Sequence, residues 1–251
     1  MSFYDTERAL AEYLMFHYGT EEQVLPRGLG PREALHFPAR CVSECVDFGR
    51  LPERARALDL GCAVGGASFE LARHFYEVIG LDSSLPFVAA AKDLARSGRI
   101  SFNATVEGTL IEWMEAVVPE GIDRGRVRFE VGDAMRPPKD LGSFNLVLAA
   151  NLIDRLQYPS AFLRRLGSLT RPGGQLVVTS PYTWLTQYTP KEEWLGGRLE
   201  EGVPVRSPER VREILGREFD LLSARDLPFL IREHERKYQW SVAEATTWRR
   251  R

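Results

Sequence analysis

The stretch that most constrains this chain is Arg56-Ala-Leu-Asp-Leu-Gly-Cys-Ala-Val-Gly-Gly66. Its first half is a short apolar run typical of a buried strand, and its second half contains only small residues. Gly61 and Gly65 permit a tight turn with close approach of a ligand to the backbone, and a following helix offers unpaired N–H groups. That helix is indicated by apolar residues at helical spacing: Ala67, Phe69, Leu71, Ala72 and Phe75. Strand, small-residue turn and helix predict the first unit of an α/β nucleotide-binding fold.

Two cofactors are compatible with this turn. The dinucleotide pattern G-x-G-x-x-G is matched by residues 61–66, except that Ala63 stands in place of the second glycine. The turn also resembles that of class I methyltransferases, which bind S-adenosylmethionine and carry an acid, here Asp59, before the glycines. Because Ala63 departs from both patterns, the turn alone leaves open either cofactor or no ligand. The resemblance implies these cofactor-binding residues: Asp59, Gly61, Cys62, Ala63 and Gly65.

Length and composition favour one globular domain over residues 1–251. Apolar residues make up 44% of the chain and charged residues 27%, and the net charge of −2 argues against a nucleic-acid or membrane surface. We expect a cytoplasmic protein, because no signal peptide, membrane-spanning run or C-x-x-C pair is present among Cys41, Cys45 and Cys62. The histidines lack ligand spacing, so we expect no metal.

Residues 1–50 are predicted to form a helical cap over the mouth of the main domain. The pattern predicts a helix over residues 5–18, capped by Asp5 or Thr6 and ended by Gly19. A second helix is predicted over residues 38–48. Such a cap closes over a small substrate and excludes water.

Residues 51–251 are predicted to form a Rossmann-like core. After the first strand, strands are expected at residues 77–82, 126–131, 144–149, 175–179, 219–224 and 241–248, and helices at 85–97, 159–169 and 208–215. Residues 98–126, with an extended piece at 99–107, do not fit this alternation and are interpreted as an insertion that is structural padding. Residues 228–240 alternate apolar and charged side chains before the last strand.

Acids at later strand ends extend the predicted cofactor site. Asp82, followed by Ser83, ends the second strand about 20 residues after Asp59, where an acid binds ribose hydroxyls, although it can equally cap the next helix. Gly132-Asp133-Ala134 resembles the class I methyltransferase run whose acid contacts the adenine amino group. Arg171-Pro-Gly-Gly174 resembles the turn before their fifth strand. A dehydrogenase would account only for the first strand–turn–helix unit. The order of the three motifs therefore favours a methyltransferase with a mostly parallel seven-stranded sheet and helices on both faces.

Polar and aromatic side chains beyond the strand ends are predicted to form the acceptor site. In open α/β sheets, ligands sit beyond the carboxyl ends of the strands. Asn151 and Tyr182 each follow a predicted inner strand, so both are expected to face the transferred methyl group. The second loop also carries Trp184, Tyr188 and Trp194 among prolines and glycines.

Several stretches carry a narrower resemblance: Phe16-His-Tyr-Gly19, Gly30-Pro-Arg-Glu-Ala34, Leu58-Asp-Leu-Gly-Cys-Ala-Val-Gly65, Ala149-Ala-Asn-Leu152, Ser180-Pro-Tyr-Thr-Trp-Leu185, Trp194-Leu-Gly-Gly197 and Tyr238-Gln-Trp-Ser-Val-Ala-Glu-Ala245. Together they resemble the C-terminal methyltransferase domain of ovothiol synthases, a 5-thiohistidine N-methyltransferase, over nearly the whole chain. In that family Ala63 is expected in the turn. No iron-binding sulfoxide-synthase portion is present, so the resemblance implies a free-standing form supplied by separate sulfoxide synthase and lyase chains.

The resemblance implies methyl transfer from S-adenosylmethionine to the imidazole π nitrogen of 5-thiohistidine, giving ovothiol A and S-adenosylhomocysteine. In-line displacement needs the deprotonated nitrogen roughly 3 Å from the methyl carbon, so the site must select a tautomer through hydrogen bonds. Asn151 and Tyr182 are expected to orient the imidazole as catalytic residues, with Asn151 also near the cofactor. Trp184 is expected to form an apolar wall.

An arginine is expected to bind the substrate carboxylate, because its fork matches bidentate geometry. The candidates are Arg27, Arg32, Arg40, Arg155 and Arg232, of which Arg40 and Arg155 are retained as substrate-binding residues. His17 and His234 are candidate bases or substrate contacts. The alternative for each arginine is that it is a solvated surface charge. The alternative for each histidine is that it has a structural role.

Three other functions remain open from the sequence. The chain could methylate another small amino acid, histidine derivative or thiol. It could be a cofactor-binding module that needs a partner for activity. A nucleic-acid methyltransferase is disfavoured by the absence of a basic excess.

Overall fold

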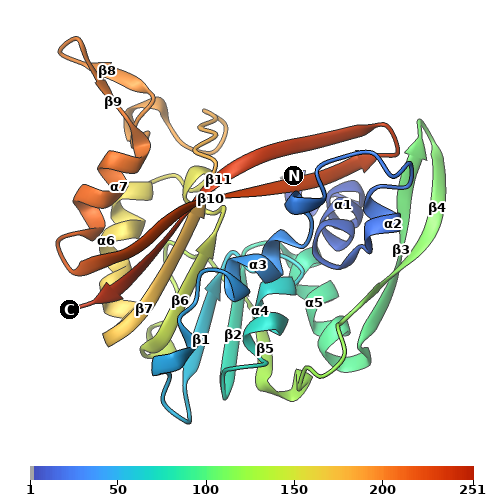
Figure 1. Cartoon of the computed structure of the whole chain (residues 1–251), viewed down its shortest axis with the longest axis horizontal. Helices are drawn as coiled ribbons and strands as arrows, with labels where there is room; N and C mark the ends of the chain where they lie inside the picture. Colours follow the sequence, from blue (N-terminus) through green and yellow to red (C-terminus); the bar gives the residue numbers. More distant parts are fainter. Residues whose placement is uncertain (1–2) are drawn as a thin grey trace.

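A computed structural model describes residues 3–251, which fold around a seven-stranded sheet (Figure 1). The order across the sheet is β10 (Phe219–His234), β11 (Lys237–Arg250), β7 (Thr170–Ser180), β6 (Phe144–Ala150), β1 (Arg56–Leu60), β2 (Glu77–Asp82) and β5 (Val127–Val131). The five strands from β7 to β5 are parallel, and β11 lies antiparallel between β7 and β10. The predicted mostly parallel seven-stranded sheet is confirmed.

Helices cover both faces of the sheet because the central strands are apolar on both sides. Leu148 of β6 packs in the core beneath one helical layer, whereas its neighbours Val147 and Ala149 pack against the opposite layer. The first layer consists of α3 (Phe37–Ser43), α4 (Gly66–Leu71) and α5 (Leu85–Ser97), and the second of α6 (Pro159–Leu169) and α7 (Ser207–Leu215). Within residues 3–251, none of the helices has the length and apolarity needed to cross a bilayer.

The N-terminal segment forms helices, as the pattern predicts, but with different bounds. Helix α1 (Glu7–Tyr18) begins after Thr6, whose hydroxyl accepts a hydrogen bond from the Ala9 N–H at 3.2 Å. A short helix, α2 (Glu21–Val24), follows and was not predicted. The predicted helix over residues 38–48 is too long, since α3 ends at Ser43. It stops there because Gln175 of β7 binds both backbone groups of Asp47 and holds the chain extended.

The two C-terminal strands are much longer than predicted. They pair from Phe219 with Arg250 to His234 with Lys237, whereas only residues 244–249 of β11 pair with β7. The far half of this pair leaves the sheet as a two-stranded ribbon that passes over α1 (Figure 1). The predicted strands at residues 219–224 and 241–248 are therefore too short. The alternation seen at residues 228–240 does not mark one packed and one solvated face, because Phe229 and Leu230, on opposite faces of β10, are both buried.

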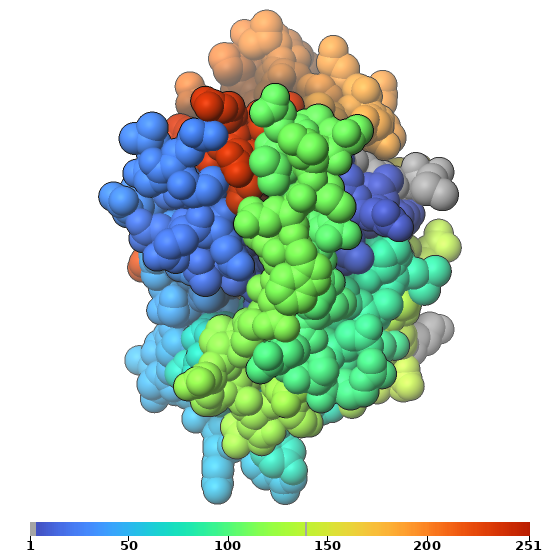
Figure 2. Space-filling model, turned by 90° about the vertical axis from the view of Figure 1, so that its right-hand side faces the viewer, coloured from blue at the N-terminus to red at the C-terminus, as the bar shows by residue number. Residues whose placement is uncertain are grey.

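The insertion forms a hairpin of β3 (Arg99–Glu107) and β4 (Leu110–Val117), so the predicted extended piece is confirmed. Met114 and Ala104 of this hairpin are buried with Met15 of α1 and Leu230 of β10. Figure 2 shows the hairpin (green) crossing one side of the molecule beside the N-terminal helices (blue). The hairpin therefore supports the cap from outside. A smaller hairpin, β8 (Arg198–Glu200) and β9 (Val203–Val205), lies away from it (Figure 1).

Gly80 of β2 tests how tightly the core is packed below the β1 turn. A Cβ atom at Gly80 would lie 2.6 Å from a Phe129 ring carbon and 3.0 Å from the Cys62 sulfur. We expect Gly80→Ala to lower the free energy of unfolding by roughly 1–3 kcal/mol, because both neighbours are buried and must shift. Urea unfolding measures this, with Gly49→Ala as the control at an exposed position whose nearest neighbour is 3.4 Å away. Equal stability of the two variants would contradict the packing described.

Candidate active site

A cavity of about 740 Å³ lies between the carboxyl ends of the parallel strands and the cap. Its size falls within the ~300–1,000 Å³ typical of small-molecule sites. The cap and the ribbon both contribute side chains to its walls. The sequence-predicted site residues that line it are His17, Asp59, Gly61, Cys62, Ala63, Ser83, Asp133, Ala134, Asn151 and Arg155.

The turn after β1 presents its backbone to this cavity. Gly61, Ala63 and Gly65 all have positive φ angles, of 73°, 48° and 88°. A Cβ atom at Gly61 would lie 2.9 Å from Leu152, so glycine is needed both for its conformation and for space. Ala63 tolerates the left-handed conformation because its N–H donates to Asp82 Oδ2 at 2.9 Å. This glycine cradle fits a ligand that approaches main-chain atoms closely.

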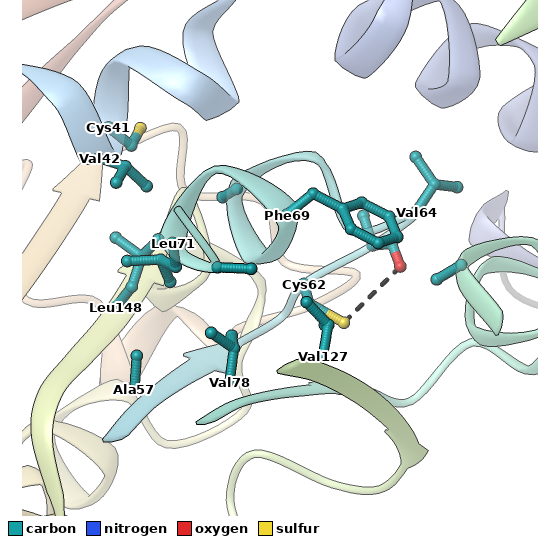
Figure 3. Packing of buried hydrophobic residues seen from close by; sticks show 14 of the residues in the cluster. Cys41, Val42, Ala57, Cys62, Val64, Phe69, Leu71, Val78, Val127 and Leu148 are labelled. Carbon is teal, nitrogen blue, oxygen red and sulfur yellow. Dashed lines mark hydrogen bonds between the residues drawn. The ribbon is translucent and has the colours of Figure 1, made fainter. Parts of the chain in front are cut away.

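The residues behind the turn form a dry layer that fixes its position. Figure 3 shows Cys62 and Phe69 within this layer, close to Val78 and Val127 of β2 and β5. The Cys62 thiol donates to the Ala63 carbonyl at 3.7 Å, and burial raises its pKa well above the usual range. The thiol is therefore neutral and acts as a packing group at the edge of the cavity.

Asp59 joins the end of β1 to helix α4. Its side chain is buried, and its Oδ2 accepts a hydrogen bond from the Ser68 hydroxyl at 2.6 Å. Burial raises the pKa of Asp59 to about 7, and the nearby Asp82 carboxylate adds to this shift. Asp59, the acid expected before the glycines, is thus bonded to Ser68 and also forms part of the cavity wall.

The acids after β2 and β5 shape the loops that meet the cavity. Asp82 does not itself line the cavity, since its oxygens accept the N–H groups of Ala63 and Ser84 at 2.9 and 2.8 Å. Asp133 Oδ1 accepts the Met135 N–H at 2.8 Å and does line it. Gly65, also predicted to bind cofactor, lies behind the turn, where a Cβ atom would clash with Phe129 at 2.5 Å.

Helix α1 ties the cap to the β1 turn by two hydrogen bonds. The Gly66 N–H, at the start of α4, donates to His17 Nδ1 at 3.0 Å, and the Tyr18 hydroxyl donates to the Val64 carbonyl at 2.7 Å. Burial lowers the pKa of His17 to about 3, so the imidazole is neutral. With Nδ1 accepting, the proton is on Nε2. His17 is therefore a hydrogen-bond donor to the cavity and not a base.

Asn151 is held rigidly at the end of β6. Its φ is 50°, its N–H donates to the Thr179 carbonyl at 2.9 Å, and its Oδ1 accepts the Thr179 hydroxyl at 2.9 Å. Because the amide oxygen is occupied in this way, Nδ2 is the group with hydrogens to donate to a ligand.

Arg155 is the member of the predicted arginine set that lines the cavity. Its Nε donates to the Tyr4 hydroxyl at 3.0 Å, and its Nη1 contacts buried Asp154 at 2.8 Å. The guanidinium carbon lies 5.2 Å from the centre of the Tyr188 ring. These contacts hold a cation at the cavity wall.

Tyr182 and Trp184 do not reach the cavity, which corrects the expectation that they contact the substrate. Tyr182 has a φ of 54°, and its hydroxyl donates to Glu244 at 2.6 Å. The Trp184 ring donates to the Ser207 hydroxyl at 2.8 Å. Both rings pack against the core beneath α6 and α7, whereas their chain neighbours Thr183 and Leu185 line the cavity.

The remaining predicted substrate residues also lie outside the cavity walls. Arg40 pairs with Glu44 at 2.6 Å and donates to the Pro228 carbonyl, and His234 Nδ1 accepts the Arg236 N–H at the ribbon tip. Arg27 and Arg32 form surface ion pairs with Glu235 and Glu21. These side chains are held in ion pairs or hydrogen bonds away from the cavity. Their spacing in the sequence therefore could not show which of them would contact a substrate.

Sequence reasoning missed several lining residues of the cap and ribbon: Tyr4, Glu12, Tyr13, Phe16, Phe37, Phe229 and Gln239. Glu12 was missed because a glutamate in an amphipathic helix usually faces solvent. The available signal was that Glu12, Tyr13 and Phe16 share one side of a helix. Burial raises the pKa of Glu12, and its hydrogen bond from Arg8 opposes the shift.

Comparison with known proteins identifies the class. Residues 32–221 match the methyltransferase domain family, which is well over half of the chain. The chain therefore belongs to this family of S-adenosylmethionine-dependent methyltransferases. It is similar to norajmaline N-methyltransferase of Rauvolfia serpentina (26% identity; 57% of this chain, 43% of the relative) and to phosphoethanolamine N-methyltransferase 3 of Arabidopsis thaliana (26%; 54% and 23%). The chain spans less than half the length of these relatives.

Solved structures show the same fold. The N-methyltransferase NodS from Bradyrhizobium japonicum, in complex with S-adenosylhomocysteine, aligns over 98% of both chains with a TM-score of 0.54 and 14% identity. A methyltransferase from Methanosarcina mazei aligns over 80% of this chain and 95% of its own, with a TM-score of 0.55 and 19% identity. These likenesses establish the Rossmann-like methyltransferase fold.

The buried His17 predicts a loss of stability in acid. Because its folded-state pKa of about 3 lies below the ordinary value of 6.5, its contribution is present above pH 6.5 and is lost as the pH falls toward 3. We expect the wild type to lose about 3 kcal/mol more than His17→Asn between pH 7 and pH 4, since asparagine keeps an acceptor for Gly66 but does not titrate. Urea unfolding across this range measures the difference, and parallel pH profiles would contradict the neutral buried state.

Proposed function

We propose that this chain methylates the imidazole π nitrogen of 5-thiohistidine, using S-adenosylmethionine as the donor and giving ovothiol A. The observation that carries the proposal is a single cavity that connects the backbone of Gly61 and Ala63 with Asn151 and Arg155. The family-like stretches of the sequence support the choice of this acceptor over other small molecules. Separate sulfoxide synthase and lyase chains would supply the thiolated histidine.

The donor end of the cavity suits S-adenosylmethionine. The glycine cradle, the Ser83 backbone and the loop at Asp133 and Ala134 are the groups that would hold it. When bound, it supplies an electrophilic methyl group on a sulfonium. His17 Nε2 would offer a neutral hydrogen-bond donor beside the cradle. The hydrogen bond from the Gly66 N–H to His17 holds the cap helix over this end, which would exclude water.

The acceptor end suits a small polar heterocycle. The fixed Nδ2 group of Asn151 would hydrogen-bond the acceptor and orient its nucleophilic nitrogen. Arg155 would bind the carboxylate, because its guanidinium is already positioned by Tyr4 and Asp154. The aromatic walls of Phe37 and Phe229, whose centroids lie 5.0 Å apart, would enclose the ring. His17 would not take a proton from the acceptor, because its Nδ1 lone pair accepts the Gly66 N–H and burial lowers its pKa to about 3.

The names of the curated relatives support a small-molecule acceptor. Norajmaline N-methyltransferase and phosphoethanolamine N-methyltransferase 3 are named for N-methylation of norajmaline and of phosphoethanolamine. The net charge of −2 also gives no basis for a nucleic-acid acceptor.

Identification of the product tests the proposal directly. We expect the purified chain with 5-thiohistidine and S-adenosylmethionine to form a product whose new methyl group is attached to the π nitrogen. Two-dimensional NMR distinguishes this N-methyl group from an S-methyl group. S-methylation, or no turnover by a chain that binds S-adenosylhomocysteine, would refute the assigned reaction.

A matched pair of variants tests the placement of the two residues predicted as catalytic. Asn151→Gly keeps the left-handed backbone but removes the amide, so we expect kcat/KM for the acceptor to fall about 10- to 100-fold. Tyr182→Phe removes only a hydroxyl bonded to Glu244, so its kcat/KM should stay near that of the wild type. Steady-state kinetics and S-adenosylhomocysteine affinity are measured for both. Loss of turnover in Tyr182→Phe alone would reverse the assignment.

A further inference from the structure

Glu12 is a buried carboxylate that the reaction chemistry above does not use. Its side chain is 6% exposed and forms part of the cavity wall, although it belongs to the cap helix α1. A buried carboxylate is costly unless cations or donors surround it, so its position calls for a ligand or a partner. Gln239 of the ribbon lines the cavity as well.

Two arginines, Arg8 and Arg232, border a small cavity beside Glu12 and do not line the large one. Arg8 Nε contacts Glu12 Oε1 at 2.7 Å. A second cavity of about 10 Å³, the size of one water molecule, is lined by Glu12 and by Arg232. Arg232 is 3% exposed, and within residues 3–251 its Nε and Nη2 have no hydrogen-bond partner. Glu233 also borders this small cavity, but Lys237 pairs with it at 2.7 Å. Burial and the Glu233 carboxylate raise the pKa of Glu12, whereas Arg8 and Lys237 oppose this shift and favour its ionised form.

Glu12 and Arg155 border the same cavity on either side of an aromatic pair. Tyr13 follows Glu12 in α1, and its ring centre lies 5.9 Å from that of Tyr4. The Tyr4 hydroxyl accepts a hydrogen bond from Arg155 Nε. Glu12 and Arg155 therefore border a common space that Tyr4 and Tyr13 also line. Asp154, the ion-pair partner of Arg155, belongs to the same wall.

We infer that Glu12 is a specificity-determining residue that binds the ammonium group of the acceptor, so that the site selects a zwitterionic α-amino acid. The inference rests on the proposed function and extends it, because Arg155 would take the carboxylate of the same molecule. An acceptor without an ammonium group would leave Glu12 paired with Arg8 alone and would lose the second ion pair, so the site binds it less tightly. Arg8 acts as a positioning residue that holds the Glu12 carboxylate by an ion pair.

A comparison of substrates and variants tests this role. The acceptors are 5-thiohistidine and its analogue without the amino group, 3-(5-thioimidazol-4-yl)propanoate. We expect Glu12→Gln to raise the KM for 5-thiohistidine about 10- to 100-fold and to change the KM for the analogue by less than about threefold, since only the first carries the cation. Glu233→Gln is the matched control, because Glu233 also contacts Arg8 but does not line the large cavity. Unchanged S-adenosylhomocysteine affinity shows that the variants are folded.

The outcomes separate this inference from the proposed function. Equal KM increases for both acceptors, or a comparable effect of Glu233→Gln, overturn the role of Glu12 and leave the reaction standing. If the wild type ignores 5-thiohistidine but methylates another α-amino acid, and Glu12→Gln still impairs that acceptor more than its analogue without the amino group, the proposed substrate is wrong and the role of Glu12 holds. If the wild type neither methylates nor binds any α-amino acid in calorimetry, both fail.

Discussion

The left-handed turn after β1, fixed from both sides, is the constraint on which the rest of the site depends. From the core side, Asp82 accepts the Ala63 N–H at 2.9 Å. From the cap side, His17 accepts the Gly66 N–H and Tyr18 donates to Val64. A non-glycine residue in this conformation costs about 1–3 kcal/mol, which these hydrogen bonds offset. The geometry of the turn is therefore linked to the docked cap helix.

Backbone strain is concentrated at the edge of the sheet where the cavity lies. Among residues 3–251, five non-glycine residues have positive φ, and three of them, Ala63, Asn151 and Tyr182, follow the neighbouring strands β1, β6 and β7. Ala63 and Asn151 thereby present main-chain and amide groups to the cavity. Tyr182 has the same backbone conformation, but its hydroxyl donates to Glu244. Backbone strain therefore occurs at this edge of the sheet even in a residue that does not line the cavity.

Local pattern predicted the core of the fold well and the acceptor side poorly. Helices α5 and α6 and strand β2 match their predicted bounds, because the helices have apolar periodicity with a proline in the first turn and β2 is a short apolar run. The ribbon was missed because residues 228–240 form a strand only by pairing with each other above α1. Glu12 was missed for the same reason. Its burial comes from the ribbon and the hairpin packed around α1, which no local window contains.

The central claim is that the cradle at Gly61 receives the adenosyl donor beneath the docked cap. Calorimetric titration with S-adenosylhomocysteine, on the wild type and on Gly61→Val, tests it most directly. A valine side chain would collide with Leu152 and could not easily adopt the φ of 73°, so the account predicts one-to-one binding by the wild type and none by the variant. Absence of binding by the folded wild type, or equal binding by a folded Gly61→Val, would contradict it.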